Sequence, residues 1–199
     1  MIVQALRSLL FYLFFYLQTV LLALVVGVSA MVWGRTRFGW VTALYWARSN
    51  LVALRVLAGI RTAVAGAGNI PDGPCILASK HMSDWDIFAI LPHTRRPAFI
   101  AKKELMDIPF FGHAARAFDT IRIDRGQRGE AIPLMLSDAR RARDLGCRII
   151  IFPEGTRKAP GAAPDYRQGV ARLYRDLGLP VVPVALDSGL FWGRNSPIL

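Results

Sequence analysis

The chain has 199 residues, of which 53% are hydrophobic, and its formal net charge at pH 7 is +11. This length favours a single globular domain, and the apolar content is sufficient for a core plus a membrane element. The positive charge fits an anionic lipid surface or a nucleic acid, but the sequence has no zinc-finger spacing, RNP-like sequence or basic helix with heptads, so we predict no nucleic-acid partner.

The N-terminal stretch predicts a membrane anchor. Residues 8–34 carry no charge, and such a run is long enough to cross a bilayer core of about 30 Å. The alternative is a cleaved signal peptide, whose apolar region would span about 7–15 residues before a small-residue cleavage site. Three arginines follow the run (Arg35, Arg37, Arg48) and one precedes it (Arg7), which places the rest of the chain on the cytoplasmic side of the cell inner membrane. The same run could instead lie as a helix within one leaflet.

A second helical segment is predicted over residues 38–58. It combines aromatic residues with Arg48 and Arg55 in a sequence rich in Leu and Val, a pattern typical of a helix at a membrane interface. An amphipathic helix that packs on a protein core would show the same pattern. We therefore predict an anchor and interfacial helix over residues 1–58 and a globular domain over residues 59–199.

The globular part alternates short apolar runs with amphipathic segments. The pattern predicts strands at Arg61–Ala65, Cys75–Ser79, Ala98–Ala101, Thr120–Ile123, Arg148–Phe152 and Val181–Leu186. It predicts helices at Asp84–Leu91, Pro109–Phe118, Gly129–Leu145 and Arg167–Leu177. Such an alternation indicates an α/β fold with a mostly parallel sheet flanked by helices.

The two cysteines, Cys75 and Cys147, lie in apolar, strand-like sequence. We predict that they are reduced core residues and that the globular domain faces a reducing compartment. Because the sequence has no Cys/His cluster, we predict no metal site.

Polar residues follow the predicted strands at the points where the strands end. Because the carboxyl ends of parallel strands meet at one edge of the sheet, where such sheets bind ligands, these side chains are expected to lie close together. They are His81 after the second strand, Lys102 and Lys103 after the third, Asp124 and Arg125 after the fourth, and Glu154 to Arg157 after the fifth.

His81 and Asp86 are the central candidates for chemistry. On one regular helix an offset of five residues turns two side chains to different faces, so the pair can meet only if His81 precedes the helix and Asp86 lies in its first turn. Ser83 and Asp86 have the spacing of a capping box, which supports such a strand-to-helix corner. The spacing also allows the interpretation that Asp86 only caps the helix and His81 is an ordinary loop residue.

A histidine oriented by a carboxylate is suited to take a proton from a hydroxyl group. No Gly-x-Ser-x-Gly elbow is present and neither cysteine lies in an activating sequence context, so we expect the nucleophile to be a substrate hydroxyl. Arg125 and Arg157 offer forked donors that match the geometry of a phosphate. Surface salt bridges are the alternative role for both arginines.

Several of these residues resemble the motifs of one family, the glycerolipid acyltransferases. His81 to Asp86 resembles its H-x4-D motif, and Phe152 to Arg157 resembles its F-P-E-G-T-R motif. Residues 121–125 resemble the arginine-bearing block, preceded by residues 103–105 and 108–112, and residues 182–186 resemble the Pro-centred fourth block. The similarity runs from about residue 77 to residue 193, with the blocks in family order, and it is strongest to members that acylate 1-acyl-glycerol 3-phosphate.

The resemblance implies transfer of an acyl chain from an acyl thioester to the free hydroxyl of lysophosphatidic acid, which makes phosphatidic acid. It implies no cofactor, with acyl-CoA or acyl carrier protein supplying the chain as co-substrate, and membrane lipids as surroundings. By similarity, His81 is the base and Asp86 orients it. The other implied site residues bind substrate: Arg125, Glu154, Gly155 and Arg157 the glycerol phosphate, Pro183 the acyl side, and Thr156 and Lys103 the substrate without a side assigned.

The sequence departs from the family pattern in places. Lys80 stands where many members have Asn, Asp119 where Gly is common, and Asp187 where Asn is frequent. Members usually continue beyond residue 194 with further strand and helix, so the resemblance predicts a domain that lacks the usual C-terminal end. Three alternatives stay open: an acyltransferase for another lysolipid or for glycerol 3-phosphate, an inactive homologue that only binds membranes, and a basic nucleic-acid-binding module.

Overall fold

The structure is a computed structural model that describes residues 2–33, 37–124, 131–194 and 196–199. Its centre is a parallel sheet of five strands in the order β3-β2-β4-β1-β5. The strands are β1 (Ile76–Ser79), β2 (Pro97–Lys102), β3 (Ile121–Ile123), β4 (Arg148–Ile151) and β5 (Val181–Val184). The pairings between neighbouring strands are all parallel. The predicted α/β class with a parallel sheet is therefore confirmed.

The predicted strand at Arg61–Ala65 is wrong. This segment is extended chain without strand pairing, and most of its residues are exposed. A strand needs a neighbour to satisfy its backbone groups, and the two sheet edges are formed by β3 and β5 instead. The segment is held by a side chain: Trp85 Nε1 donates a hydrogen bond to Thr62 Oγ1 over 3.1 Å.

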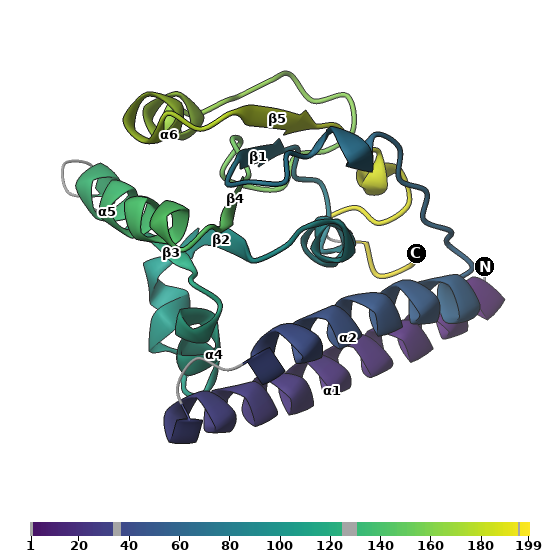
Figure 1. The fold of residues 1–199 in the computed structure, drawn as a ribbon. Helices are drawn as coiled ribbons and strands as arrows, with labels where there is room; N and C mark the ends of the chain where they lie inside the picture. Colours follow the sequence, from purple (N-terminus) through teal and green to yellow (C-terminus); the bar gives the residue numbers. More distant parts are fainter. Residues whose placement is uncertain (1, 34–36, 125–130, 195) are drawn as a thin grey trace.

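Helices cover both faces of the sheet (Figure 1). On one face lie α5 (Ala131–Asp144) and α6 (Gly169–Leu177). The other face is covered by α3 (Trp85–Ile90), and α4 (Phe111–Ala117) lies between the sheet and the N-terminal helices. The four helices predicted in the globular part are present, and residues 129–130 of the third prediction lie outside the described residues. Short 3-10 segments are η2 (Ala67–Asn69), η3 (Leu91–His93), η4 (Lys103–Asp107) and η5 (Ser188–Leu190).

Two long helices form the N-terminal part. Helix α1 (Ile2–Trp33) and helix α2 (Arg37–Ala53), which continues into the π-helical segment η1 (Leu54–Ala58), lie side by side beneath the sheet domain (Figure 1). By length and composition α1 could cross a membrane, and 17% of its most apolar window is buried. Its large exposed side chains include Leu6, Leu9, Leu10, Leu13, Leu17, Val20 and Leu21.

Apolar packing divides into layers on the two sides of the sheet. Between the sheet and α5 and α6, the buried side chains include Ile76, Ile121, Met135, Ile149 and Leu173. A second cluster joins the N-terminal helices to α3 and to the C-terminal segment, through Phe11, Phe15, Leu54, Phe88 and Trp192. The N-terminal helices thus share a core with the element that carries Asp86.

The close contact between α1 and α4 depends on a glycine. A Cβ atom added at Gly27 would lie 2.5 Å from the backbone oxygen of Phe110, too close for any side chain. The absence of a side chain at this position lets α1 lie directly against the turn that leads into α4.

Candidate active site

His81 lies at the carboxyl edge of the sheet, in the loop that connects β1 to α3. Its backbone N–H donates to Glu154 Oε2 over 3.1 Å, and its carbonyl accepts from the Lys158 N–H over 2.8 Å. Both partners belong to the loop that follows β4, the strand next to β1 in the sheet. Because β1 and β4 are adjacent and parallel, the residues that follow them, His81 in one loop and Glu154 and Lys158 in the other, lie in contact.

The predicted contact between His81 and Asp86 is present. His81 Nδ1 lies 2.9 Å from Asp86 Oδ2, and the Asp86 side chain is fully buried whereas the His81 side chain is 16% exposed. With Asp86 ionised, Nδ1 carries the proton and donates it to this hydrogen bond, which leaves the lone pair on Nε2. The pair has the arrangement of a general base and the carboxylate that orients it.

Asp86 also caps its helix. Its Oδ2 accepts hydrogen bonds from the backbone N–H groups of Met82 (2.6 Å) and Ser83 (3.0 Å), while Ser83 Oγ accepts from the Trp85 N–H (3.1 Å). The bond from the Ser83 N–H to Asp86 is one half of a capping box, while the Ser83 hydroxyl bonds to the Trp85 N–H instead of the Asp86 N–H. The interpretation that Asp86 only caps the helix is therefore wrong, because the same carboxylate also contacts the His81 ring.

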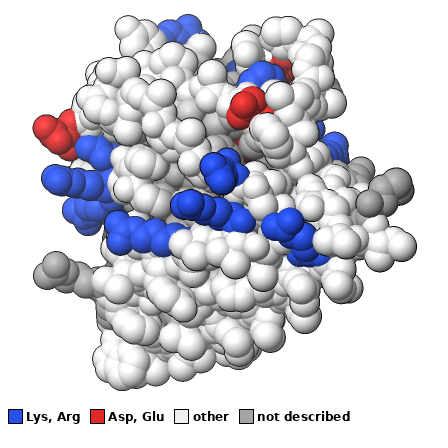
Figure 2. Space-filling view, turned by 90° about the vertical axis from the view of Figure 1, so that its right-hand side faces the viewer, with Lys and Arg blue, Asp and Glu red and all other residues white. Residues whose placement is uncertain are grey.

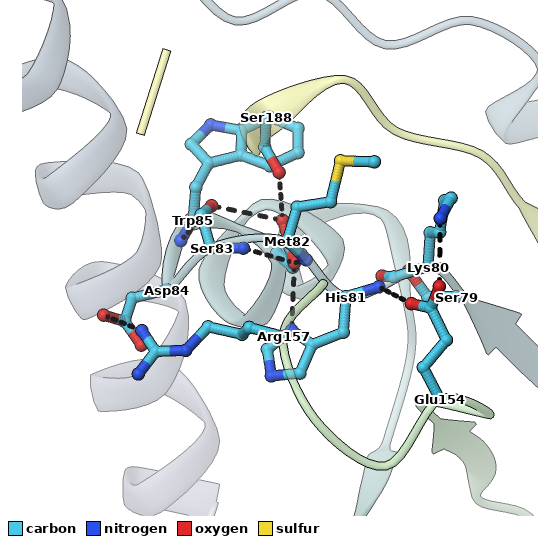
Figure 3. Close-up of polar contacts among 11 residues, drawn as sticks. Ser79, Lys80, His81, Met82, Ser83, Asp84, Trp85, Glu154, Arg157 and Ser188 are labelled. Carbon is cyan, nitrogen blue, oxygen red and sulfur yellow. Dashed lines mark hydrogen bonds and ion pairs between the residues drawn. The ribbon is translucent and has the colours of Figure 1, made fainter. Parts of the chain in front are cut away.

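Two side chains of the loop after β4 hold His81 from other directions. The ring of Phe152 stacks on the imidazole with centroids 4.1 Å apart and an interplanar angle of 22°. The fully buried Glu154 forms an ion pair with Lys80, whose Nζ lies 2.9 Å from Oε1. Figure 3 shows Glu154 and Lys80 together on one side of His81, with Arg157 and Asp84 on the other.

A large cavity runs past His81. Its volume is about 1060 Å³, and it extends from the catalytic edge to the space between the sheet and the N-terminal helices. Most of the lining is apolar and comes from several elements, including Leu22, Val26, Trp40, Trp46, Phe99, Met106 and Phe118. The cations in its lining are Lys102, Arg157, Arg167, Arg172 and Arg194. The cavity thus joins a basic mouth to an apolar interior.

Arg157, one of the two arginines predicted to bind phosphate, lines the same cavity as His81. Its Nη1 lies 2.8 Å from Asp84 Oδ2, and its side chain is 28% exposed. Arg157, Thr156 and Gly155 all line the cavity together with His81. Gly155 adopts a left-handed conformation with φ of +66°, and this tight turn brings residues 155–157 back towards the cavity.

The other predicted substrate-binding residues are placed differently. Glu154 is absent from the cavity lining, because its carboxylate faces Lys80 and the His81 backbone. Lys103 is 51% exposed and lies 3.5 Å from Asp124, and Pro183 is exposed on the edge strand β5, opposite Ala78. The structure brings neither Lys103 nor Pro183 into the cavity. Arg125 lies outside the described residues.

The cysteines lie where the sequence predicted. Cys75 and Cys147 are both buried, and neither forms a disulfide. Burial raises the pKa of the Cys75 thiol, which makes that group a poor nucleophile at neutral pH. Among the described residues, no group of three or more His, Cys, Asp or Glu side chains could hold a metal ion.

Sequence reasoning missed two residues that contact the His81–Asp86 pair, Phe152 and Ser188, and a third, Lys80, that pairs with Glu154. Phe152 and Lys80 belong to the quoted motifs, but their contacts with His81 and Glu154 depend on the pairing of β1 with β4. Ser188 follows β5 and donates to Asp86 Oδ1. Its position after a predicted strand was the available signal, because the ends of parallel strands meet at one edge.

The chain is similar to known proteins in both sequence and fold. The sequence model of the family described as Acyltransferase matches residues 61–187. A protein of Pseudomonas aeruginosa named 1-acyl-sn-glycerol-3-phosphate acyltransferase is 35% identical, with 96% of this chain and 75% of the relative covered. The human 1-acyl-sn-glycerol-3-phosphate acyltransferase alpha is 33% identical, with 71% of this chain and 50% of the relative covered.

A solved structure shares the whole fold. The crystal structure of the 1-acyl-sn-glycerophosphate acyltransferase PlsC from Thermotoga maritima superposes with a TM-score of 0.75 at 25% identity, covering 98% of this chain and 81% of that one. The match includes the N-terminal helices as well as the sheet. The family model, the similar sequences and the shared fold together show that this chain belongs to the acyltransferase family.

Proposed function

We propose that the protein transfers an acyl chain from an acyl thioester to the free hydroxyl of 1-acyl-glycerol 3-phosphate, which forms phosphatidic acid. The observation that carries this proposal is the hydrogen bond between His81 Nδ1 and Asp86 Oδ2 at the wall of a cavity large enough for lipid chains. The names of the similar proteins from Pseudomonas aeruginosa and human support the choice of acceptor.

The His81–Asp86 pair performs the transfer as follows. Nε2 of His81 takes the proton of the acceptor hydroxyl, and the resulting oxygen attacks the thioester carbonyl carbon. The protonated imidazole is stabilised by the Asp86 carboxylate. When the tetrahedral intermediate collapses, the C–S bond breaks and the leaving thiolate takes the proton from Nε2, so that an ester and a free thiol are released and the histidine is neutral again.

The rest of the cavity serves to bind the two substrates. Arg157 supplies a forked cation for the acceptor phosphate beside His81. The apolar lining between the sheet and the N-terminal helices receives acyl chains. The donor thioester is carried on coenzyme A or on acyl carrier protein, and both present their acyl group on the same flexible arm.

We also propose that α1 lies within one leaflet, at the cytoplasmic face of the inner membrane. Its buried residues run from Ser8 to Ser29 and face the rest of the protein, while its remaining surface is apolar and exposed. Figure 2 shows Lys and Arg side chains in a band above the lower part of the molecule, where α1 and α2 lie. Such a border between apolar and basic surface suits contact with anionic lipid head groups.

The replacement His81→Ala tests the activity. We expect phosphatidic acid formation by the purified full chain to fall by about 10²–10⁴-fold, the usual contribution of a general base. The assay uses labelled lysophosphatidic acid with acyl-CoA in one arm and acyl carrier protein in the other, and it also follows vesicle binding, which the replacement should leave intact. His93→Ala, which removes an exposed histidine outside the cavity lining, is the control. A His81→Ala protein with an unchanged rate would contradict the proposal and favour a membrane-binding role.

A further inference from the structure

The second oxygen of the catalytic carboxylate has a partner of its own. Asp86 contacts His81 through Oδ2, and its Oδ1 accepts a hydrogen bond from Ser188 Oγ over 2.6 Å. Ser83 Oγ also approaches Oδ1, at the longer distance of 3.3 Å. Ser188 is 7% exposed and Asp86 is fully buried, so no water competes for this bond. In Figure 3 Ser188 lies at the top of the view and His81 below it.

A hydrogen bond to Oδ1 restricts the orientation of the whole carboxylate and therefore the position of Oδ2. A carboxylate rotates about its Cβ–Cγ bond, and a partner on each oxygen fixes the plane of the group. A fixed plane holds Oδ2 in line with Nδ1 of His81, and this in turn directs Nε2 into the cavity. Hydrogen bonds to a charged group are shorter and stronger than those between neutral groups, so the Ser188 bond fixes the carboxylate together with the backbone N–H groups of Met82 and Ser83 on Oδ2.

Ser188 reaches Asp86 because its turn lies directly against the catalytic loop. The next residue, Gly189, approaches Met82 so closely that an added Cβ would lie 2.9 Å from Met82 Cβ. Any larger residue at position 189 would push η5 away from the loop that carries His81. The φ angle of Gly189 is not in the left-handed region, so its backbone conformation does not require a glycine. The close packing against Met82 does require one.

The turn is anchored on the N-terminal helix. The Trp192 N–H donates to the Ser188 carbonyl over 2.8 Å. The buried Trp192 ring packs edge-on against Phe11 of α1, with centroids 5.3 Å apart, and against Phe15, with centroids 5.8 Å apart. A continuous set of contacts thus runs from α1 through Trp192 and Ser188 to the carboxylate of Asp86.

We propose that Ser188 is a positioning residue for the acyl transfer, which fixes the plane of the Asp86 carboxylate and is itself held in place by the packing of Trp192 on α1. This inference rests on the proposed function, because it assigns Ser188 a part in that reaction. It also gives α1 a role in the catalytic centre in addition to its place at the membrane.

The first test compares two serines of the same C-terminal segment. Ser188→Ala removes the hydroxyl that contacts Asp86, and Ser196→Ala removes an exposed hydroxyl that bonds only within its own segment. In the full chain, Ser188→Ala should lower kcat by about 10- to 100-fold, the effect of losing one hydrogen bond to a charged group. The KM values for acceptor and donor should stay within about twofold, because the bond is outside the substrate contacts. Ser196→Ala should match the wild type, and Ser188→Thr, which keeps the hydroxyl, should recover most of the lost kcat.

The second test asks whether Ser188 acts through Asp86. In an Asp86→Ala background the hydroxyl has no carboxylate to hold, so adding Ser188→Ala should change the residual kcat by less than about twofold. Gly189→Ala keeps the Ser188 hydroxyl but displaces the turn that carries it. It should lower kcat when Asp86 is present and should not change the residual kcat of the Asp86→Ala protein. Thermal unfolding of each variant shows that the fold is retained.

Two results would overturn the inference. One is a folded Ser188→Ala protein with wild-type kcat, and the other is an equal fractional loss in the Asp86 and Asp86→Ala backgrounds, which would indicate an independent effect. Failure of the proposed function looks different, because the wild-type chain would then form no phosphatidic acid in either donor arm.

Discussion

Single side chains at this site perform more than one task. Asp86 accepts hydrogen bonds from two backbone N–H groups, a serine hydroxyl from each of two loops and the His81 ring. A fully buried carboxylate needs such compensation, because an ionised group without partners would be costly to bury. The same bonds that make burial tolerable also define the direction of the catalytic hydrogen bond.

Glu154 belongs to a family motif but lies outside the cavity lining. Its carboxylate connects Lys80 and the His81 backbone, so we expect Glu154→Gln to act on the position of His81. Loss of its charge should lower kcat by about tenfold or more, with a lower unfolding temperature. The KM for lysophosphatidic acid should change by less than about threefold, as steady-state kinetics can show.

The opposite pattern would identify a direct substrate contact. If Glu154→Gln raised the acceptor KM strongly while leaving the unfolding temperature unchanged, the carboxylate would belong to the binding site after all. Glu104→Gln, outside the cavity lining, is the matched control. Lys80 fits the same account, since its ammonium group neutralises the buried Glu154.

At the scale of elements, an ion pair braces β3 against α5. Arg122 donates to Asp138 from Nε over 2.7 Å and from Nη2 over 3.0 Å. Burial raises the pKa of Asp138, but the hydrogen bonds and charge of Arg122 together outweigh this effect, so the pKa of the carboxyl is lowered overall. The brace fixes the strand that ends at the mouth of the cavity.

From the ion pair between Arg122 and Asp138 we predict that Asp138→Asn destabilises the fold and that the loss depends on pH. A carboxyl with a lowered pKa stabilises the fold above its unfolded pKa of about 4 and loses this contribution as the pH falls through its folded pKa. We expect urea unfolding to show the variant about 1–2 kcal/mol less stable at pH 7, because Arg122 is partly exposed and its bonds are screened. The gap should shrink below pH 4.

The control is Asp144→Asn, at the exposed end of the same helix. It should cost less than about 0.5 kcal/mol at any pH. A constant difference between wild type and Asp138→Asn from pH 7 to pH 3 would show that the ion pair does not contribute through charge.

At the scale of the whole molecule, the placement of α1 determines where the cavity lies relative to the membrane. The helix packs on the rest of the protein from Ser8 to Ser29, so a perpendicular crossing would draw the polar domain into the bilayer. Burying charged groups there is expensive. A helix in the plane of one leaflet instead leaves the cavity, whose walls include Leu22 and Val26 of α1, next to the lipid phase.

Cysteine labelling distinguishes the two arrangements. Ile2→Cys and Trp33→Cys place thiols at the two ends of α1, at residues that are 87% and 71% exposed. With a membrane-impermeant maleimide, we expect neither thiol to react in intact spheroplasts and both to react in inverted vesicles. Tyr166→Cys reports the side of the catalytic domain, and the unmodified chain, whose two cysteines are buried, gives the background. One end reacting from each side would show that α1 crosses the membrane.

Local sequence patterns were sufficient to predict most of the helices and strands and the corner at His81. The apolar run of α1, the five strands of the sheet, the corner at His81 and the capping-box spacing of Ser83 and Asp86 all arise from periodicity and short-range hydrogen bonds. Such signals act over a few residues and are therefore present in the chain before it folds. The error at residues 61–65 has the same origin, because a strand-like pattern does not say whether a partner strand is available.

The contacts between residues far apart in the sequence depend on the assembled fold. Ser188 reaches Asp86, and Glu154 reaches Lys80, because β5 and β4 flank β1 in the sheet. That order is set by the packing of the whole core. It also makes the apolar helix α1 a wall of the cavity, since burial of Phe11 and Phe15 against Trp192 and Phe88 can be realised only in the assembled fold.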